Sequence, residues 1–342
     1  MENINKLDSV DQVEPLDKFV KADDKGLFEI IGTSEESIDR LLSSAPYSYW
    51  RETFKTLFKN KVAILCFGIL FVLVFFTIFG PMMKHYDYYA VTNLPTYVKP
   101  FGSVELTIAG VTKNYTFWFG TNGTKKDIWS VTWDGARISL LLAVVVSLIN
   151  AVLGLFIGSV WGFFPKLDPI FIELRNFVSN VPSLLFYILF MKWFSGKVPT
   201  FWAIVIVLCI FGWMGLAATL RNNIIIIRNR DFNIASKTLG SKPTAIIVNN
   251  LLPYLVSIIV TILATSIPGV IDSEVSLSFF NLSYAGQLTL GGVITAATSA
   301  SNDWMAYPFT MLIPSAIVIA LTVACYYIGF SLADATDPRN HR

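Results

Sequence analysis

The stretch RDFNIASKTLGSKPTAIIVNNLLP (residues 230–253) interrupts the hydrophobic sequence of this chain with polar and charged side chains. It begins like a short helix, Gly240 then allows either a close approach of another backbone or a turn of the chain, and Pro243 suits the first turn of a following helix. Its charges exclude it from a bilayer core. They are Arg230, Asp231, Lys237 and Lys242. We expect either a helix at about residues 229–241 that lies on the membrane surface and offers a face to a soluble partner, or an ordinary polar loop.

The composition places the chain in a membrane. Of its 342 residues, 54% are hydrophobic and only 15% are charged, whereas soluble domains contain about 25% charged residues. A bilayer core of about 30 Å requires roughly 20 apolar residues per helix. Six runs approach or exceed that length, which predicts an all-α membrane protein with six transmembrane helices. The runs are Val62–Gly80, Ile138–Pro165, Asn176–Met191, Val198–Leu220, Pro243–Ile271 and Trp304–Ala333.

Basic residues that flank the spans predict their orientation. They cluster before the first span, between the fourth and fifth spans, and after the sixth span. With six spans these three groups share one side, and the excess of Lys and Arg marks that side as cytoplasmic. We therefore expect both termini in the cytoplasm. The flanking residues are Arg51, Lys55, Lys59, Lys61, Arg221, Arg228, Arg230, Lys237, Lys242, Arg339 and Arg342.

The spans divide the chain into five regions. Residues 1–44 hold 11 acidic and 5 basic side chains and predict a partly disordered cytoplasmic tail. Residues 45–61 alternate aromatic and basic faces, as an interfacial amphipathic helix would. Residues 62–83 form the first span, and residues 84–135 form an extracytoplasmic loop with a small β-like insertion, whose alternating sequence favours a hairpin around Ala109-Gly110. Residues 136–338 hold the remaining spans.

The sequence offers little material for catalysis or metal binding. It has two histidines and three widely separated cysteines, and it lacks the Walker-type phosphate-binding loop. An ion-driven transporter would need charges at membrane depth. The four candidates, Glu173, Arg175, Asp272 and Glu274, fall at span edges, where we expect interfacial anchors or helix-end ion pairs. The energy for any transport is therefore expected to come from another chain, with no metal, cofactor or nucleic acid bound by this one.

The opening stretch resembles the cytoplasmic loop signature of permease subunits in ATP-binding-cassette importers. That signature runs Glu-Ala-Ala, three residues, Gly, nine residues, then Ile-x-Leu-Pro. Gly240, Leu252 and Pro253 match it, while Ile234 stands in place of the Glu and Asn250 in place of the Ile. The resemblance implies a coupling helix at 229–241 that docks on an ATPase, and loss of the acidic side chain puts any salt bridge at that place in doubt. The implied contact residues are Asp231, Ile234, Ala235, Ser236, Thr238, Leu239 and Gly240.

Three further segments resemble the C-type membrane subunit of the oligopeptide and dipeptide permeases. They are FGTNGTKKDIWSVTWDGARISL (119–140), SEVSLSFFNLS (273–283) and GFSLADATDPR (329–339). With the coupling signature they make four ordered blocks, and together the resemblance runs from about residue 48 to the end. The residues that the resemblance marks as structural are Gly120, Asp127, Gly135, Arg137, Pro253, Glu274, Gly329, Asp334, Asp337, Pro338 and Arg339.

The resemblance implies a non-catalytic subunit of an ATP-driven peptide importer in the bacterial plasma membrane. Its expected partners are a homologous permease, two cytoplasmic subunits that bind ATP and Mg²⁺, and an extracytoplasmic substrate-binding lipoprotein. A related importer for nickel or a glycoside is an alternative reading. An autonomous secondary transporter is a further alternative, although neither buried ions nor an inverted repeat favours it.

Overall fold

The computed structural model describes residues 49–84, 94–108, 111–282, 289–299 and 303–336. The chain divides into two compact units, residues 1–50 and 51–342. The predicted tail and the residues Asp337, Pro338 and Arg339 lie outside the described ranges. Apart from Tyr49 and Trp50, the described residues belong to the second unit.

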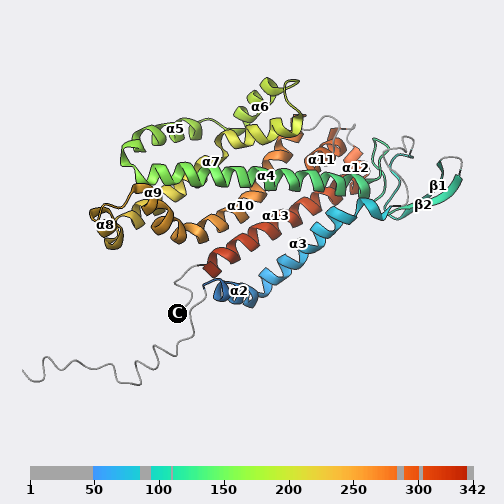
Figure 1. Cartoon of the computed structure of the whole chain (residues 1–342). Helices are drawn as coiled ribbons and strands as arrows, with labels where there is room; N and C mark the ends of the chain where they lie inside the picture. The colour runs from blue at the N-terminus through green and yellow to red at the C-terminus, as the bar shows by residue number, and fades with distance from the viewer. Residues whose placement is uncertain (1–48, 85–93, 109–110, 283–288, 300–302, 337–342) are drawn as a thin grey trace, which may run out of the picture. The chain divides into compact units, whose positions relative to one another are not determined.

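Helices make up most of the described chain (Figure 1). Two short 3₁₀ turns are η2 (Pro81–Met83) and η3 (Pro165–Leu167), and a π-helical turn is η4 (Ile246–Leu251). The α-helices are α2 (Tyr49–Lys59), α3 (Lys61–Phe79), α4 (Ile128–Phe163), α5 (Asp168–Asn180), α6 (Ser183–Phe194), α7 (Thr200–Arg228), α8 (Asp231–Thr238), α9 (Pro243–Ala245), α10 (Leu252–Phe279), α11 (Leu290–Ser299), α12 (Asp303–Ala306) and α13 (Phe309–Thr336).

Five helices within the described ranges are long and apolar enough to cross a membrane: α3, α4, α7, the Ile258–Phe279 part of α10, and α13. The third predicted span, Asn176–Met191, is not one straight helix. It falls across α5 and α6, which meet at an 89° bend next to Pro182. Proline disfavours the α conformation in the residue before it and supplies no N–H, so the helix breaks there. The number of spans is five, or six if the bent pair crosses.

Two span boundaries differ from the sequence prediction. α4 begins at Ile128, before the predicted start at Ile138, because the Asp127 side chain accepts a hydrogen bond from the backbone N–H of Trp129 at 3.3 Å and caps the helix. The fifth span is displaced in the opposite direction. Its helix continues to Phe279, so Asp272 and Glu274 lie within it, beyond the predicted end at Ile271.

α4 and α7 pack closely and run parallel. A Cβ added to Gly154 would lie 2.8 Å from Leu216, one on Gly158 would lie 2.9 Å from the Ala217 Cα, and one on Gly162 would lie 3.0 Å from the Arg221 Cα. Residue numbers therefore rise together along both helices. The glycines repeat every four residues on one face of α4, which lets the two backbones approach as small residues do in membrane helix pairs.

The parallel packing constrains the segment that joins these helices. The chain leaves α4 at Phe163 and must return to Thr200, the start of α7. At 1.5 Å per residue, α7 rises about 36 Å from its start to the level of Ile224, which packs beside Gly162. α5 and α6 are the elements that make this return, and Figure 1 shows α5 running beside α7 with α6 near its start.

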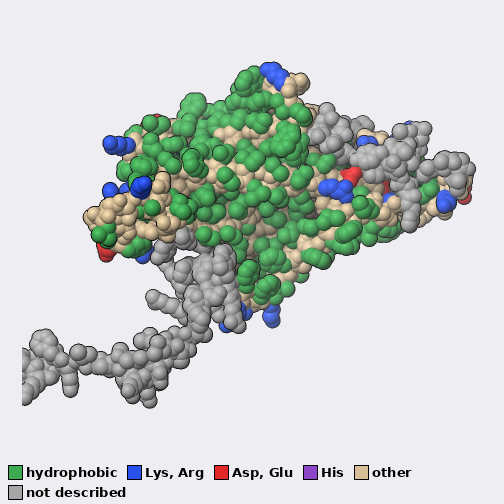
Figure 2. Space-filling view, in the orientation of Figure 1, with side chains coloured by type: hydrophobic (Ala, Val, Ile, Leu, Met, Phe, Trp, Pro, Cys, Tyr) green, Lys and Arg blue, Asp and Glu red, His purple; other side chains and the backbone are tan. Residues whose placement is uncertain are grey.

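The remaining long helices complete one bundle. α10 packs on α13 and α4, α13 packs on α3, and α11 lies against α10, α13 and α4. Hydrophobic side chains cover most of the bundle face seen in Figure 2, as expected of helices that face lipid. In α3, for example, Leu65 and Phe71 are exposed. Leu57 of α2 is buried beside Ala63 and Ala335, which joins the start of the bundle to the end of α13.

The alternating segment after α3 contains two antiparallel strands, β1 (Gly102–Ile108) and β2 (Val111–Phe117). Their register pairs Gly102 with Phe117 and Ile108 with Val111. The predicted turn at residues 109–110 lies outside the described ranges. β2 then leads through an irregular segment into α4, and the strands lie at the opposite end of α4 from α8 (Figure 1).

Candidate functional site

The predicted surface segment contains a short helix, α8, between α7 and α9. Arg230 precedes it, and Leu239 and Gly240 follow it. The φ angle of Gly240 is +82°, a conformation that L side chains rarely adopt. Gly240 therefore ends the helix as a left-handed glycine and directs the chain toward Pro243, where the next helical segment begins.

α8 exposes apolar side chains and buries a polar one. Ile234 is 49% exposed and Leu239 is 85% exposed, and Phe232 is also exposed. Asp231, Ala235 and Thr238 are exposed as well. Asn233, by contrast, is buried. Isolated exposed apolar residues are ordinary, but two on this short helix and a third immediately after it form an exposed apolar surface.

Asparagine side chains attach α8 to the helices on either side of it. Asn233 Nδ2 donates to the carbonyl of Ile227 in α7 at 2.8 Å, and Asn250 Nδ2 donates to Asn233 Oδ1 at 2.9 Å. Asn250 also lies 3.4 Å from Ser236 Oγ. It belongs to the π-helical turn η4, so α8 is bonded both to the end of α7 and to the turn that precedes α10.

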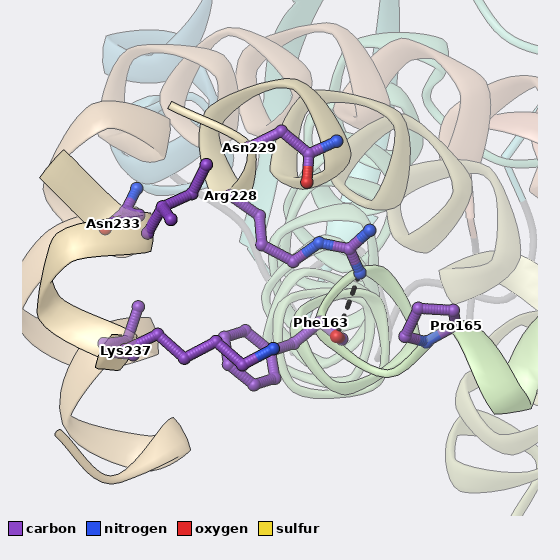
Figure 3. A pocket seen from close by; sticks show the side chains of 8 residues that line it. Phe163, Pro165, Arg228, Asn229, Asn233 and Lys237 are labelled. Carbon is purple, nitrogen blue, oxygen red and sulfur yellow. Dashed lines mark hydrogen bonds between the residues drawn. The ribbon is translucent and has the colours of Figure 1, made fainter. Parts of the chain in front are cut away.

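A pocket of about 290 Å³ lies between α8 and the end of α4. Arg228 enters it from α7 and donates through Nη1 to the carbonyls of Gly162 and Phe163, at 3.0 Å each. These carbonyls are at the C-terminal end of α4, where a cation is favoured. Lys237 extends across the pocket from α8 toward Phe163 (Figure 3). The other residues that line the pocket are Pro165, Asn229, Asn233, Ile234 and Ile246.

A second group of polar contacts, close to this pocket, joins α4, α5 and α7. Arg221 of α7 donates to both carboxylate oxygens of Asp168, at 2.9 and 2.8 Å, in a bidentate ion pair. The indole N–H of Trp161 donates to the same carboxylate at 2.8 Å. The ends of α4 and α7 nearest α8 are therefore held together by hydrogen bonds from two arginines of α7, Arg221 and Arg228.

Glu274 forms a buried polar cluster toward the other end of α4. The side chain is 0% exposed. Ser139 Oγ donates to Oε2 at 2.9 Å, and Ser278 Oγ bonds Oε1 at 2.7 Å. Ser139 also accepts from the backbone N–H of Leu290 at 3.0 Å. The prediction of an interfacial anchor or a helix-end ion pair is wrong for Glu274, because the described structure joins it to serines on α4 and α10.

The cluster at Asp127 closes the same end of the bundle. Asp127 is buried and lies 3.8 Å from Lys84 Nζ, which also donates to the carbonyl of Thr116 at 3.1 Å. Lys84 lies over the Trp118 ring at 4.7 Å. Burial lowers the pKa of Lys84, while the carboxylate of Asp127 opposes that shift. This contact attaches the chain after α3 to both β2 and the start of α4.

The remaining motif residues have packing roles in the described ranges. Gly120 has a φ of +82°, and a Cβ there would lie 2.9 Å from Phe309. Gly135 lets α4 approach the backbone of Thr289, Arg137 donates to the carbonyl of Ile78 at 3.0 Å, and Gly329 lies against Thr265. Two more are placed by their helices alone: Pro253 in the first turn of α10 and Asp334, exposed, in α13.

Most of the predicted site residues thus lie near one end or the other of α4, with Gly329 and Asp334 on α13, and sequence reasoning missed several residues that organise each end of α4. Asn233, Ser139 and Ser278 were not selected from the sequence. A useful signal was present for Asn250, since two adjacent asparagines interrupt the apolar run AIIVNNLLP. The serines gave no such signal, because Ser occurs often in membrane helices and only the fold brings these two to Glu274.

Residues 151–342 match the family described as the binding-protein-dependent transport system inner membrane component, and residues 48–100 match the N-terminal transmembrane domain of oligopeptide transport permease C. The oligopeptide transport system permease protein AmiD of Streptococcus pneumoniae is 31% identical, over 95% of this chain and 97% of that protein. Two Bacillus subtilis proteins are similar: the oligopeptide permease protein OppC, 28% identical over 92% of this chain and 97% of its own length, and the dipeptide permease protein DppC, 29% identical over 86% and 87%.

Proposed function

This chain belongs to the family of binding-protein-dependent transport system inner membrane components, and from that premise we propose that it is a membrane-spanning subunit of an ATP-driven peptide importer. The cargo is inferred from the relatives, which are named oligopeptide and dipeptide permeases. The family and the apolar helices support a multi-pass protein of the bacterial inner membrane. Its partners would be a homologous permease, two ATPase subunits and an extracytoplasmic binding lipoprotein.

The observation that carries the proposal is the exposed apolar surface of α8. Ile234 and Leu239 project from a helix that is bonded to both α7 and the start of α10. An ATPase that binds these side chains would move α7 and α10 together. Nucleotide binding can shift the spans only if it favours one arrangement of the ATPase subunits over another. α8 would transmit that preference to the bundle through Asn233 and Asn250.

The departure from the family signature fits this arrangement. Ile234 occupies the place of the signature's acidic residue, so this chain would dock there by apolar contact rather than by a salt bridge. The adjacent Asp231, Ala235, Ser236, Thr238 and Gly240 would complete the contact surface. Asn250, which is partly buried, takes the place of the signature's Ile and donates a hydrogen bond to Asn233 of α8.

The parallel packing of α4 and α7 supports six crossings. If both helices cross in the same direction, the chain between them must cross in the opposite direction, and only α5 and α6 lie there. The bent pair then counts as one broken span, and an even number of spans puts both termini on one side. We propose the cytoplasm for that side, which places α8 facing the ATPases and β1–β2 outside. The proposed domain limits are those predicted from the sequence, except that the outer loop ends at Asp127, just before α4 begins, and 229–241 is the coupling segment.

The test is a Leu239→Asp substitution in the assembled transporter. Leu239 is largely exposed and lies outside the helix body, so folding should be unaffected. We expect the ATPase subunits to be lost on purification and peptide uptake to fall at least tenfold, because a charge would be buried in an apolar contact. Met305→Asp, exposed near the other end of the bundle, is the matched control. Normal co-purification and uptake with Leu239→Asp would reject the docking role of α8.

A further inference from the structure

A second feature adjoins the α8 pocket: an apolar groove of about 350 Å³ along α4. One wall consists of α4 side chains and the other of residues from α9 to the start of α10. Val152 is 66% exposed, Phe156 is 70% exposed and Val248 is 57% exposed. The groove residues are Val152, Leu155, Phe156, Ser159, Val160, Thr244, Ile247, Val248 and Leu252. The volume is in the range of small-molecule sites.

The groove and the α8 pocket are neighbours along α4. Val152, Phe156, Val160 and Phe163 are spaced by four, four and three residues, so they form one stripe on α4. Phe163 lines the pocket and Val160 lines the groove. On the opposite wall, Ile246 lines the pocket and its neighbour Ile247 lines the groove. A molecule could thus enter the pocket with one end and lie along α4 with the other.

The two compartments differ in polarity. Arg228 and Lys237 both line the pocket, and within the described residues neither has a carboxylate within 4.0 Å. Nη1 of Arg228 bonds the α4 carbonyls, which leaves its other guanidinium nitrogens for a ligand. The groove contains no charged side chain. Ser159 lines it as well, but its hydroxyl oxygen is buried and is not accessible from the groove, so the accessible surface of the groove is apolar.

We propose that this combined site binds an anionic phospholipid of the inner leaflet. The phosphate would lie between Arg228 and Lys237, and an acyl chain would occupy the groove. Basic pockets at the ends of membrane helices bind anionic headgroups in this way. An acidic protein side chain would satisfy the pocket but not the groove, which is why a lipid is the occupant that fits both. A bound lipid would join α8 to the end of α4.

The first arm of the test addresses the headgroup. The purified transporter complex, in micelles of detergent and phosphatidylcholine, is titrated with phosphatidylglycerol while its thermal unfolding midpoint is recorded. Lys237→Gln should weaken the apparent affinity about fivefold, since one basic residue near the surface contributes about that factor. Lys242→Gln is the control, because Lys242 is exposed on the same loop and lies outside the pocket. Equal stabilisation by both lipids, or an unchanged affinity in Lys237→Gln, would overturn the proposal.

The second arm separates a lipid from a free phosphate. Val152→Trp fills the groove, and Val323→Trp places the same side chain on an exposed position of α13. We expect only Val152→Trp to weaken phosphatidylglycerol binding, and glycerol phosphate to stabilise the complex far less than the lipid. Comparable stabilisation by glycerol phosphate would identify a phosphate site without a lipid. Loss of the ATPase subunits from Lys237→Gln with an unchanged lipid response would assign the pocket to a protein partner, and either result would overturn the proposal.

Discussion

The two ends of α4 are built in opposite ways. At the Asp127 end, buried polar groups meet across several segments: Glu274 and Ser139 are fully enclosed, and Lys84 lies against Asp127. At the Phe163 end, apolar side chains are exposed on α8, and Asn233 supplies the buried polar contact. The described polar groups at the Asp127 end are therefore satisfied by contacts within this chain, whereas the Phe163 end has exposed apolar surface that other molecules can contact.

The largest effect should come from breaking the enclosed end. Glu274→Leu leaves the hydroxyls of Ser139 and Ser278 without their acceptor inside the bundle. Unsatisfied buried groups cost about 1–3 kcal/mol each, so we expect a loss of about 4 kcal/mol. The measurement is the yield of monodisperse protein by size-exclusion chromatography, together with its thermal midpoint. Glu274→Gln is the control, because its amide can bond both serines. A stable Leu variant would show that the cluster does not hold the helices.

The next effect tests the middle of α4, which joins the two ends. Gly158→Leu places a side chain where the α7 backbone lies within 3 Å, and overpacking of this kind costs about 1–3 kcal/mol. Gly215→Leu on α7 is the matched control, because nothing lies within 4 Å of the added Cβ. The thermal unfolding midpoint of purified Gly158→Leu should therefore be lower than that of purified Gly215→Leu. Equal midpoints would contradict the close parallel packing.

A smaller effect is expected from the polar link at the open end. Asn233→Ala and Asn250→Ala should each destabilise the attachment of α8 by about 1 kcal/mol, since each removes a hydrogen bond. The double variant should cost less than the sum of the two, because the residues bond each other at 2.9 Å. Hydrogen exchange of the α8 amides measures the local opening. Additive effects would mean that the two asparagines act separately.

The smallest effect concerns a charge pair near the enclosed end. Asp134 and Arg137 approach only to 3.8 Å; the Arg137 side chain is 47% exposed and the Asp134 side chain is 14% exposed. A loose pair whose cation is open to solvent contributes about 0–1 kcal/mol. Asp134→Asn should therefore shift the thermal midpoint hardly at all, which separates this partly exposed pair from the buried cluster. If Asp134→Asn lowers the midpoint as much as Glu274→Leu does, then burial does not distinguish the polar groups that stabilise this end from those that do not.

Hydrophobic runs predicted much of the fold. The apolar segments from Val62, Val198 and Trp304 all contain long helices, because a run of about 20 apolar residues has few alternatives in a membrane chain. The same rule failed for Asn176–Met191. Counting hydrophobic residues cannot distinguish a straight helix from two short ones joined at Pro182, since both bury the same side chains.

The candidate site was predicted less evenly. Gly240 was correctly selected as a turn, because a glycine at the end of a polar helix is a local signal. The positions of Glu274 and Asn233 were beyond such signals. A buried glutamate and a span-edge glutamate have similar sequence neighbours, and the partners that distinguish them come from α4 and α7. Contacts between segments far apart in sequence are what a single sequence leaves open.

The backbone contact between α4 and α7 has a mechanical consequence. At Gly158 the carbonyl and Cα of Ala217 lie where a side chain would otherwise stand. The backbones meet at Gly158, and Leu216 and Ile224 pack against Gly154 and Gly162 on either side of that contact, so the two helices should move as one unit. A displacement of a few ångströms at the α8 end would then reach the other end of both helices almost unchanged. Bending would instead occur elsewhere in the chain, most directly at the 89° bend beside Pro182.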